Sequence, residues 1–275
     1  MISILFTLML ATEPKLIVAA NGAKPAGPYS PALQAQDFIY VSGQGVRDSQ
    51  GKMPDGIDAQ ARQCVENVKA LLDAAGASMK DVTAAQFFLL DMKHRPLVEK
   101  LWAEHGGTPV KESVWLGVAR MPTDTTVEIT VYARKGTAGK SSRSVVNYVD
   151  GAGSDGVVGV AALGGGAKKA SLALRVGPAP AVYCPVVTGD ASTGGVEEQT
   201  KSAFAKLQSC LEKNGTTLAK VVATNVYVDN IDDFAKMNAV YATYFPGVKP
   251  TRTTVQPLAP GKAPGKVRIA ALALR

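Results

Sequence analysis

The chain has 275 residues, of which 46% are hydrophobic and 19% charged, with 27 glycines and 16 prolines. This is the composition of a globular protein of about two domains, and it excludes a disordered or fibrous chain. The three cysteines and two histidines lack the number and spacing of a closed zinc site or a disulfide framework. We therefore expect no structural metal, no metal in any site, and no disulfide bond holding the fold together.

The net charge of +7 is unevenly distributed. Residues 1–140 carry 15 Lys and Arg against 14 Asp and Glu, whereas residues 141–275 carry 15 against 9. A basic half can indicate an anionic partner, nucleic acid included. No run of Lys and Arg with interleaved aromatic residues occurs, so we expect a solvated basic surface and no nucleic-acid partner.

The first eleven residues, Met1 to Ala11, are nearly all apolar. They are similar to the apolar part of an export signal, but no Lys or Arg precedes them and they are shorter than most signals. An extra buried strand is another interpretation. No apolar stretch approaches the length of a transmembrane helix. We expect a cytoplasmic protein that does not enter a membrane, with export as the alternative.

After this segment, alternating and β-branched residues predict a hairpin of strands at Ala32–Gln34 and Phe38–Gln44. A stripe with the 3.6-residue period of a helix then begins at Ile57, and Gly76 stands where a helix C-terminal cap favours a residue without a Cβ. The elements expected next are a strand at Val82–Asp91, a short helix with Pro96 in its first turn, and strands at Ser113–Val118 and Val127–Ala133.

The same order returns in the second half of the chain, which indicates an internal repeat. The helical stripe reappears 139 positions later, from Val196, and Gly215 takes the place of Gly76. Cys64 and Cys210 fall on these stripes and are interpreted, like Cys184, as small buried apolar side chains. The other elements expected here are weaker strands at Leu172–Val176 and Val182–Val187, a strand at Val221–Asp229, a short helix capped by Asp232 or Asp233, and strands at Thr253–Leu258 and Val267–Leu274.

We therefore expect an α+β fold of two tandem domains, each β-β-α-β-α-β-β, with two helices on one face of a mixed sheet. The first domain spans residues 12–136 and the second, more divergent domain spans residues 167–275. Residues 137–166 are rich in Gly, Ala and Ser, as is typical of a linker. Within the linker, Val145–Val149 is a candidate for an extra strand.

The last predicted strand is apolar on both faces, because Ala270, Leu272 and Leu274 alternate with a second apolar set. A sheet of this kind must bury both faces. We infer that the helix-free face packs against another copy of the module, within the chain or in another subunit. We expect a homo-oligomer, and a homotrimer would supply six copies, enough for two stacked three-fold rings.

Several motifs within these elements are similar to those of one known family. They are Gly27-Pro28-Tyr29-Ser30-Pro31, Val41-Ser42-Gly43-Gln44, Glu66-Asn67-Val68-Lys69-Ala70-Leu71-Leu72, Asn238-Ala239-Val240-Tyr241 with Tyr244-Phe245, and Pro250-Thr251-Arg252-Thr253-Thr254-Val255. On these residues the chain resembles the RidA/YjgF family, over nearly its whole length, as two tandem copies.

The resemblance implies a chorismate-mutase-like fold and trimers with ligand clefts between neighbouring copies. It implies an enamine/imine deaminase, a hydrolase that converts 2-enamino and 2-imino acids to 2-keto acids and ammonia without a metal or organic cofactor. Some relatives only bind small acids, and others are described as ribonucleases or translation inhibitors. A catalytically degenerate carboxylate-binding or structural protein, and an RNA-binding or ribonuclease-like protein, are therefore the alternatives.

The resemblance also assigns two catalytic residues, and they fall in different copies. The family's carboxylate-binding Arg corresponds to Arg252, and its water-handling Glu corresponds to Glu128. In the first copy, Lys111 takes the place of Arg252, and a lysine cannot form the bidentate contact of an arginine. In the second copy, Arg268 takes the place of Glu128. Lys111 is a candidate second anion contact, although a solvated lysine is the simpler interpretation. For Glu128, an ion pair with Arg268 or Lys111 is an equally good interpretation.

The remaining substrate-binding candidates are Tyr29, Ser42 and Gly43 in the first copy. Their second-copy counterparts are Leu172 and Pro185-Val186-Val187, so the polar loop is lost there. Neither copy is complete. Clefts between like copies would all be defective, whereas a cleft between unlike copies would contain both Arg252 and Glu128. We favour the shared cleft, because an orphaned charge on a buried sheet face is costly. The partner expected there is a small carboxylate-bearing substrate.

Overall fold

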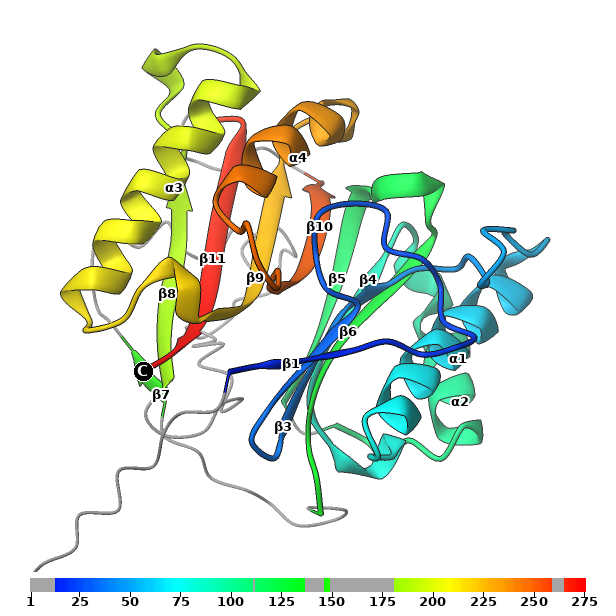
Figure 1. Cartoon of the computed structure of the whole chain (residues 1–275). Helices are drawn as coiled ribbons and strands as arrows, with labels where there is room; N and C mark the ends of the chain where they lie inside the picture. Colours follow the sequence, from blue (N-terminus) through cyan, green and yellow to red (C-terminus); the bar gives the residue numbers. More distant parts are fainter. Residues whose placement is uncertain (1–12, 111, 137–145, 149–180, 259–264) are drawn as a thin grey trace, which may run out of the picture.

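In the computed structural model, the described residues are 13–110, 112–136, 146–148, 181–258 and 265–275. We refer to residues 13–136 as the first copy and to 181–275 as the second. The first copy is built of strands and two helices (Figure 1). They are β1 (Lys15–Ile17), β2 (Ala32–Ala35), β3 (Phe38–Gln44), α1 (Ile57–Ala74), β4 (Val82–Leu89), α2 (Arg95–Glu104), β5 (Glu112–Arg120) and β6 (Val127–Arg134).

The second copy repeats this order from the counterpart of β3 onward. Its elements are β8 (Ala181–Thr188), α3 (Val196–Lys213), β9 (Val221–Val228), α4 (Phe234–Thr243), β10 (Thr251–Pro257) and β11 (Val267–Leu274). The expected strand at Leu172–Val176 and most of the expected linker lie outside the described residues. The extra strand predicted near Val145 is confirmed as β7 (Val146–Tyr148), which pairs parallel with β8.

Glycine ends both long helices where the sequence predicts it. Gly76 and Gly215 have φ of 71° and 73°, in the left-handed region that glycine enters without strain. The next residue then folds back, so that the Ala77 amide donates to the Leu72 carbonyl and the Thr216 amide donates to Leu211, at 2.9 and 3.0 Å. These bonds satisfy carbonyls that the helix end leaves free.

The predicted cap of the second short helix is wrong. The Asp233 side chain makes no capping hydrogen bond at the start of α4. Instead, the Asn230 side chain accepts from the Asp232 amide at 3.1 Å in the turn that precedes the helix. The cap therefore acts on a 3-10 turn, Ile231–Asp233, which the periodicity of the sequence does not reveal.

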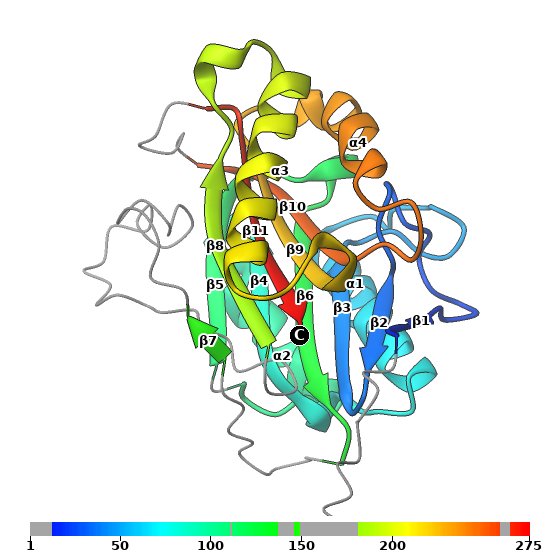
Figure 2. The ribbon, with the colours of Figure 1, turned by 60° about the vertical axis from the view of Figure 1, so that its left-hand side comes forward.

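All the strands belong to one mixed sheet, in the order β1-β2-β3-β6-β4-β5-β10-β9-β11-β8-β7. The two copies meet edge to edge through the antiparallel pair β5 and β10, where Gln256 lies opposite Arg120 and Pro257 opposite Val118. The helices of the two copies lie toward opposite sides of the molecule (Figure 1), and Figure 2 shows α3 crossing β8 and β11. The α+β class and the tandem arrangement are therefore as predicted.

The two helix-free faces pack against each other. Alternate residues of the strands divide between clusters: Ile39 and Val41 lie in the core under α1, whereas Tyr40 belongs to a core shared by both copies. The members of that shared core are Leu33, Ala35, Phe38, Tyr40, Ala84 and Tyr132 of the first copy, and Ala181, Val222, Ala223, Leu272 and Leu274 of the second. The inference that this face packs against another copy is confirmed, and the other copy lies in the same chain.

Two cysteines form a disulfide bond, so the expectation that no disulfide holds the fold is wrong. Cys184 on β8 and Cys210 on α3 are bonded, with their Cα atoms 6.2 Å apart. They meet because α3 packs over β8. An odd number of cysteines says only that at least one stays free within the chain. Here the free cysteine is Cys64, which lies on α1 and is buried in the core of the first copy.

Candidate functional site

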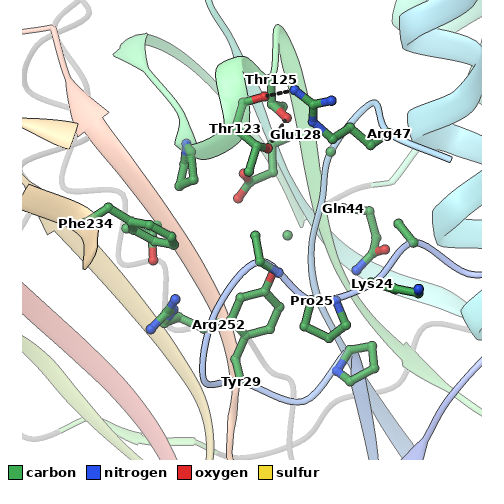
Figure 3. A pocket seen from close by; sticks show the side chains of 17 residues that line it. Lys24, Pro25, Tyr29, Gln44, Arg47, Thr123, Thr125, Glu128, Phe234 and Arg252 are labelled. Carbon is green, nitrogen blue, oxygen red and sulfur yellow. Dashed lines mark hydrogen bonds between the residues drawn. The ribbon is translucent and has the colours of Figure 1, made fainter. Parts of the chain in front are cut away.

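One pocket is lined by residues of both copies (Figure 3). The first copy contributes the loop 23–26, Tyr29, Gly43 to Gly45, Arg47, the turn near Thr123, and Glu128. The second copy contributes Phe234, Arg252 and Thr254. Glu128 and Arg252 thus share one pocket, which is the arrangement of unlike copies favoured from the sequence.

Arg252 is a buried cation without a carboxylate partner in the described part of the chain. Arg252 is 3% exposed, and both of its terminal guanidinium nitrogens are buried without a hydrogen-bond partner. Three aromatic rings surround the guanidinium carbon: Tyr29, Phe234 and Tyr241, with centroids at 4.9, 5.4 and 4.7 Å. The rings offer cation–π attraction but accept no strong hydrogen bonds. The Nη atoms are therefore available to an anion.

Hydrogen bonds from the first copy hold the backbone of Arg252 in place. The Arg252 amide donates to the Ser42 hydroxyl at 2.9 Å, and that hydroxyl donates to the Ser30 carbonyl at 2.6 Å. Ser30 in turn bonds to the start of β10, with its amide donating to the Pro250 carbonyl at 3.1 Å. Ser42 is fully buried and does not line the pocket. Ser42 thus anchors the strand that carries Arg252, and a direct contact of Ser42 with substrate stays a prediction.

Glu128 lies on β6 and is 7% exposed. Burial raises the pKa of its carboxyl group to about 8, although the positive charge of Arg252 opposes part of this rise. The carboxyl group lies directly against Gly43, where a Cβ would overlap Oε1 and would lie 2.6 Å from Cδ. Gly43 thus leaves room for the Glu128 carboxyl group by the absence of a side chain.

The family model described as Endoribonuclease L-PSP matches residues 20–135 and 183–274, which is most of the chain and covers both copies. The chain belongs to this family. It is the same family as the RidA/YjgF family that the sequence motifs resemble. The two matched segments also agree with two tandem copies of one module.

Three known proteins that resemble the chain each match less than half of it. A RutC family protein of Pyrococcus horikoshii is 37% identical over 123 residues, which are 44% of this chain and 98% of the relative. A 2-iminobutanoate/2-iminopropanoate deaminase of Escherichia coli is 34% identical over 125 residues, 43% of this chain and 96% of the relative. The crystal structure of E. coli TdcF with bound serine is 29% identical, covers 44% of this chain and 99% of its own, and gives a TM-score of 0.42.

Arg268, the second-copy counterpart of Glu128, does not pair with Glu128. Its Nη1 lies 2.5 Å from Oδ1 of Asp229, and the residue is 1% exposed. Asp229 directly follows β9, which is the neighbour of β11 in the sheet, so the acid lies within reach in the same copy. The interpretation of Glu128 as the ion-pair partner of Arg268 is therefore wrong. Lys111, the other proposed partner, lies outside the described residues.

Sequence reasoning missed part of the surroundings of Arg252 and Glu128. Phe234 and Tyr241 lie on α4 and pack in the core of the second copy, and their rings also lie against the Arg252 guanidinium. Arg47 reaches the pocket from the loop after β3 because its guanidinium bonds to the Thr123 carbonyl at 3.0 Å (Figure 3). No motif in the sequence points to Arg47, since its place depends on the path of the loop.

The described residues contain no group of three or more His, Cys, Asp or Glu side chains that could hold a metal ion. Over the same ranges, every helix is too short or too polar to span a bilayer. The Cys64 thiol donates to the Gln44 carbonyl at 3.0 Å, and burial raises the pKa of this thiol well above its usual value. A buried thiol of this kind is a poor nucleophile.

Proposed function

We propose that this chain is an imine deaminase that hydrolyses 2-imino acids, and the enamines in equilibrium with them, to 2-keto acids and ammonia. The observation that carries the proposal is the pairing of a buried guanidinium, Arg252, with Glu128 in one pocket. Family membership and the deaminase names of two relatives support it. The assignment of roles below is part of the proposal.

Arg252 would bind the carboxylate of the substrate. The two free Nη atoms match the two oxygens of a carboxylate, which gives parallel charge-assisted hydrogen bonds. Because Arg252 is already desolvated and its backbone is held by Ser42, little reorganisation is required on binding. The ring of Tyr29 lies over the guanidinium and limits the positions that a substrate can take.

Glu128 would activate the water that attacks the imine carbon. The imine reacts in its protonated form. As the water oxygen forms its bond to carbon, a water proton passes to the Glu128 carboxylate, the C=N electron pair moves to the protonated nitrogen, and this nitrogen becomes a neutral amine. The same proton then moves from Glu128 to that nitrogen. The C–N bond breaks, ammonia leaves and the remaining hydroxyl proton is released as the C=O bond forms. With a pKa of about 8, the ionised fraction of Glu128 would act as the base, and this fraction grows as the pH rises toward 8.

The test is the rate of 2-oxobutyrate formation from 2-iminobutanoate generated in the same solution. We expect the purified chain to accelerate formation over the uncatalysed reaction and Arg252→Ala to abolish the acceleration. Arg62→Ala is the control, because Arg62 is a half-exposed arginine on α1 outside the pocket. Full activity of Arg252→Ala would overturn the proposal.

A second candidate is a carboxylate-binding protein without turnover. It is favoured by the protonated state that the raised pKa gives Glu128 in the empty pocket at neutral pH, since a neutral acid cannot accept a proton from water. Calorimetry with 2-oxobutyrate separates the two candidates. Binding together with an absence of imine hydrolysis would select the second.

The oligomeric state is a further part of the proposal. The homotrimer was expected because the helix-free face of each copy needs a partner. In the single chain, the helix-free faces of the two copies already cover each other. Sedimentation equilibrium of the full chain tests whether three chains still associate, since a homotrimer would have three times the chain mass of 28.6 kDa.

A further inference from the structure

The pocket contains two further cations on the side away from Arg252. Lys24 and Arg47 both line it, and Figure 3 shows them on the opposite side from Arg252 and Phe234, with Glu128 in the region between. The proposed reaction at Arg252 and Glu128 does not use either cation. Their presence therefore raises the question of which part of a ligand they would contact.

Arg47 has a fixed position and an unneutralised charge. Its Nη1 donates to the Gly51 carbonyl at 2.9 Å and its Nη2 donates to the Thr123 carbonyl at 3.0 Å. No carboxylate of the described residues lies within 4 Å of it. The acid next to it in sequence, Asp48, is used otherwise, because its carboxylate accepts from the amides of Gln50 and Lys52. The guanidinium is thus held in place by neutral groups alone.

Lys24 lies on the loop that precedes β2 and forms no ion pair with any residue that the structure describes. Glu128 is the only carboxylate among the lining residues, and burial raises its pKa to about 8. A pocket with Arg252, Arg47 and Lys24 against this one acid has more positive charge than a single substrate carboxylate can balance.

Building on the proposed function, we infer that the pocket prefers a 2-imino acid with a second carboxylate at the far end of its side chain. The carboxylate next to the imine carbon lies on Arg252, the imine carbon faces Glu128, and the distal carboxylate lies between Arg47 and Lys24. The substrate class is thus the imines of dicarboxylic amino acids, and their products are 2-oxo dicarboxylic acids.

The test compares two keto acids that differ in the distal carboxylate, 2-oxoglutarate and 2-oxobutyrate, by calorimetry with the full chain. We expect 2-oxoglutarate to bind about tenfold more tightly, as two partly exposed charge contacts would provide together. We expect the double variant Lys24→Gln with Arg47→Gln to lose most of this preference. The glutamine amide that replaces the Arg47 guanidinium can still donate to a neighbouring carbonyl, so the variant removes charge more than structure.

Lys80→Gln is the control for the loss of charge alone. Lys80 is an exposed lysine of the same copy outside the pocket, and its loss lowers the net charge of the chain by one, half of the change in the double variant. We expect this control to keep the preference for 2-oxoglutarate. A loss of preference in Lys80→Gln equal to that in the double variant would mean that only overall charge matters, and it would overturn the inference.

The outcomes separate the inference from the proposed function. Equal affinity for the two keto acids overturns the inference but leaves imine hydrolysis at Arg252 and Glu128 intact. Tighter binding of 2-oxoglutarate that the double variant abolishes supports the inference. If this result comes with no hydrolysis of either imine, the second anion site stands and the deaminase proposal fails. Binding of neither acid overturns both.

Discussion

The hydroxyl of Ser42 accepts a hydrogen bond from the amide of Arg252 at 2.9 Å, so a residue of the first copy positions the guanidinium carried by the second. The same hydroxyl donates to the Ser30 carbonyl at 2.6 Å, and the Ser42 residue is fully buried. The complementarity of the copies therefore includes more than the division of Glu128 and Arg252 between them. The first copy also fixes the strand on which the Arg lies.

Ser42→Ala should weaken substrate binding because it removes this anchor. It leaves a buried amide without an acceptor, which costs about 1–3 kcal/mol of stability. It also lets Arg252 shift, and we expect KM to rise about tenfold with a smaller change in kcat. Steady-state kinetics on 2-iminobutanoate measures this. Ser202→Ala is the control, since Ser202 also accepts from a backbone amide, that of Asp190, outside the pocket. An equal rise of KM in both variants would refute the positioning role.

Gly43→Ala should displace Glu128. A Cβ at this position would overlap Oε1 of Glu128, and Gly43 lies on β3, where the backbone has little freedom to move. We expect kcat to fall about 100-fold while 2-oxobutyrate still binds to Arg252. Gly247→Ala is a suitable control, because a Cβ at Gly247 would meet nothing within 4 Å. Normal kcat in Gly43→Ala would mean that the position of Glu128 is unimportant for turnover.

The sequence predicts the elements well because their signals are local. Helical periodicity and the glycines at 76 and 215 define α1 and α3 to within a residue or two. The alternation of apolar residues in β11 predicts a second buried face, and the shared core confirms it. The partner of that face could not be chosen, because two copies in one chain and two copies in different chains leave the same pattern in the sequence.

Contacts between distant residues account for the errors. Cys184 and Cys210 are bonded because of the way α3 crosses β8, and a count of cysteines contains no such information. An ion pair of Glu128 with Arg268 was one of two equally good interpretations, because the two positions are equivalent in the repeat. Arg268 pairs with Asp229 because neighbouring strands bring these two residues together within one copy.

The sequence pointed to the acid and the Arg of the candidate pocket, and to Tyr29 and Gly43 beside them, but not to the rest of its lining. Motif resemblance located Glu128 and Arg252, and the structure brings them into one pocket. Of the three aromatic rings around Arg252, Tyr29 and Tyr241 lie in the quoted motifs, whereas Phe234 and the loop cation Arg47 lie in none. Phe234 has the spacing of a core residue, and a helix stripe cannot distinguish a side chain that faces a core from one that faces a buried guanidinium.

Glu128→Gln should stabilise the chain, and the gain should increase with pH. The folded-state pKa of Glu128 is about 8, above its usual value of 4.5. Below pH 4.5 the carboxyl group is protonated in both the folded and unfolded states, so it imposes no cost of ionisation. Between pH 4.5 and about 8, the unfolded chain releases the proton and the folded chain retains it. The free energy of unfolding therefore falls as pH rises through this range and levels off above about 8.

A glutamine at position 128 cannot ionise, so the free energy of unfolding of this variant does not fall with pH for this reason. We expect the two chains to differ by on the order of a few kcal/mol in the free energy of unfolding at about pH 9, and by much less at low pH, where the carboxyl group is protonated in both states. Urea unfolding of both chains across this range is the measurement. A difference that stays constant with pH would show that Glu128 has an ordinary pKa in the folded chain.

Reduction of the disulfide should destabilise the second copy. Cys184 and Cys210 are separated by 26 positions, and closing a loop of this length in the unfolded chain is worth about 3 kcal/mol in the chain-entropy description. We expect a lower midpoint of thermal unfolding in the presence of a reducing agent. Thiol titration of the unreduced, denatured chain should find one free thiol, from Cys64, and three after reduction.

The control for this experiment is the variant Cys184→Ala with Cys210→Ala. Because it cannot form the bond, its unfolding midpoint should lie near that of the reduced chain and should not respond to the reducing agent. Arg252 and Glu128 are on other strands, β10 and β6, and their pocket contains neither cysteine. Binding of 2-oxobutyrate below the unfolding transition should therefore survive reduction. If three thiols react before reduction, the bond is absent and α3 is held on β8 by apolar packing alone.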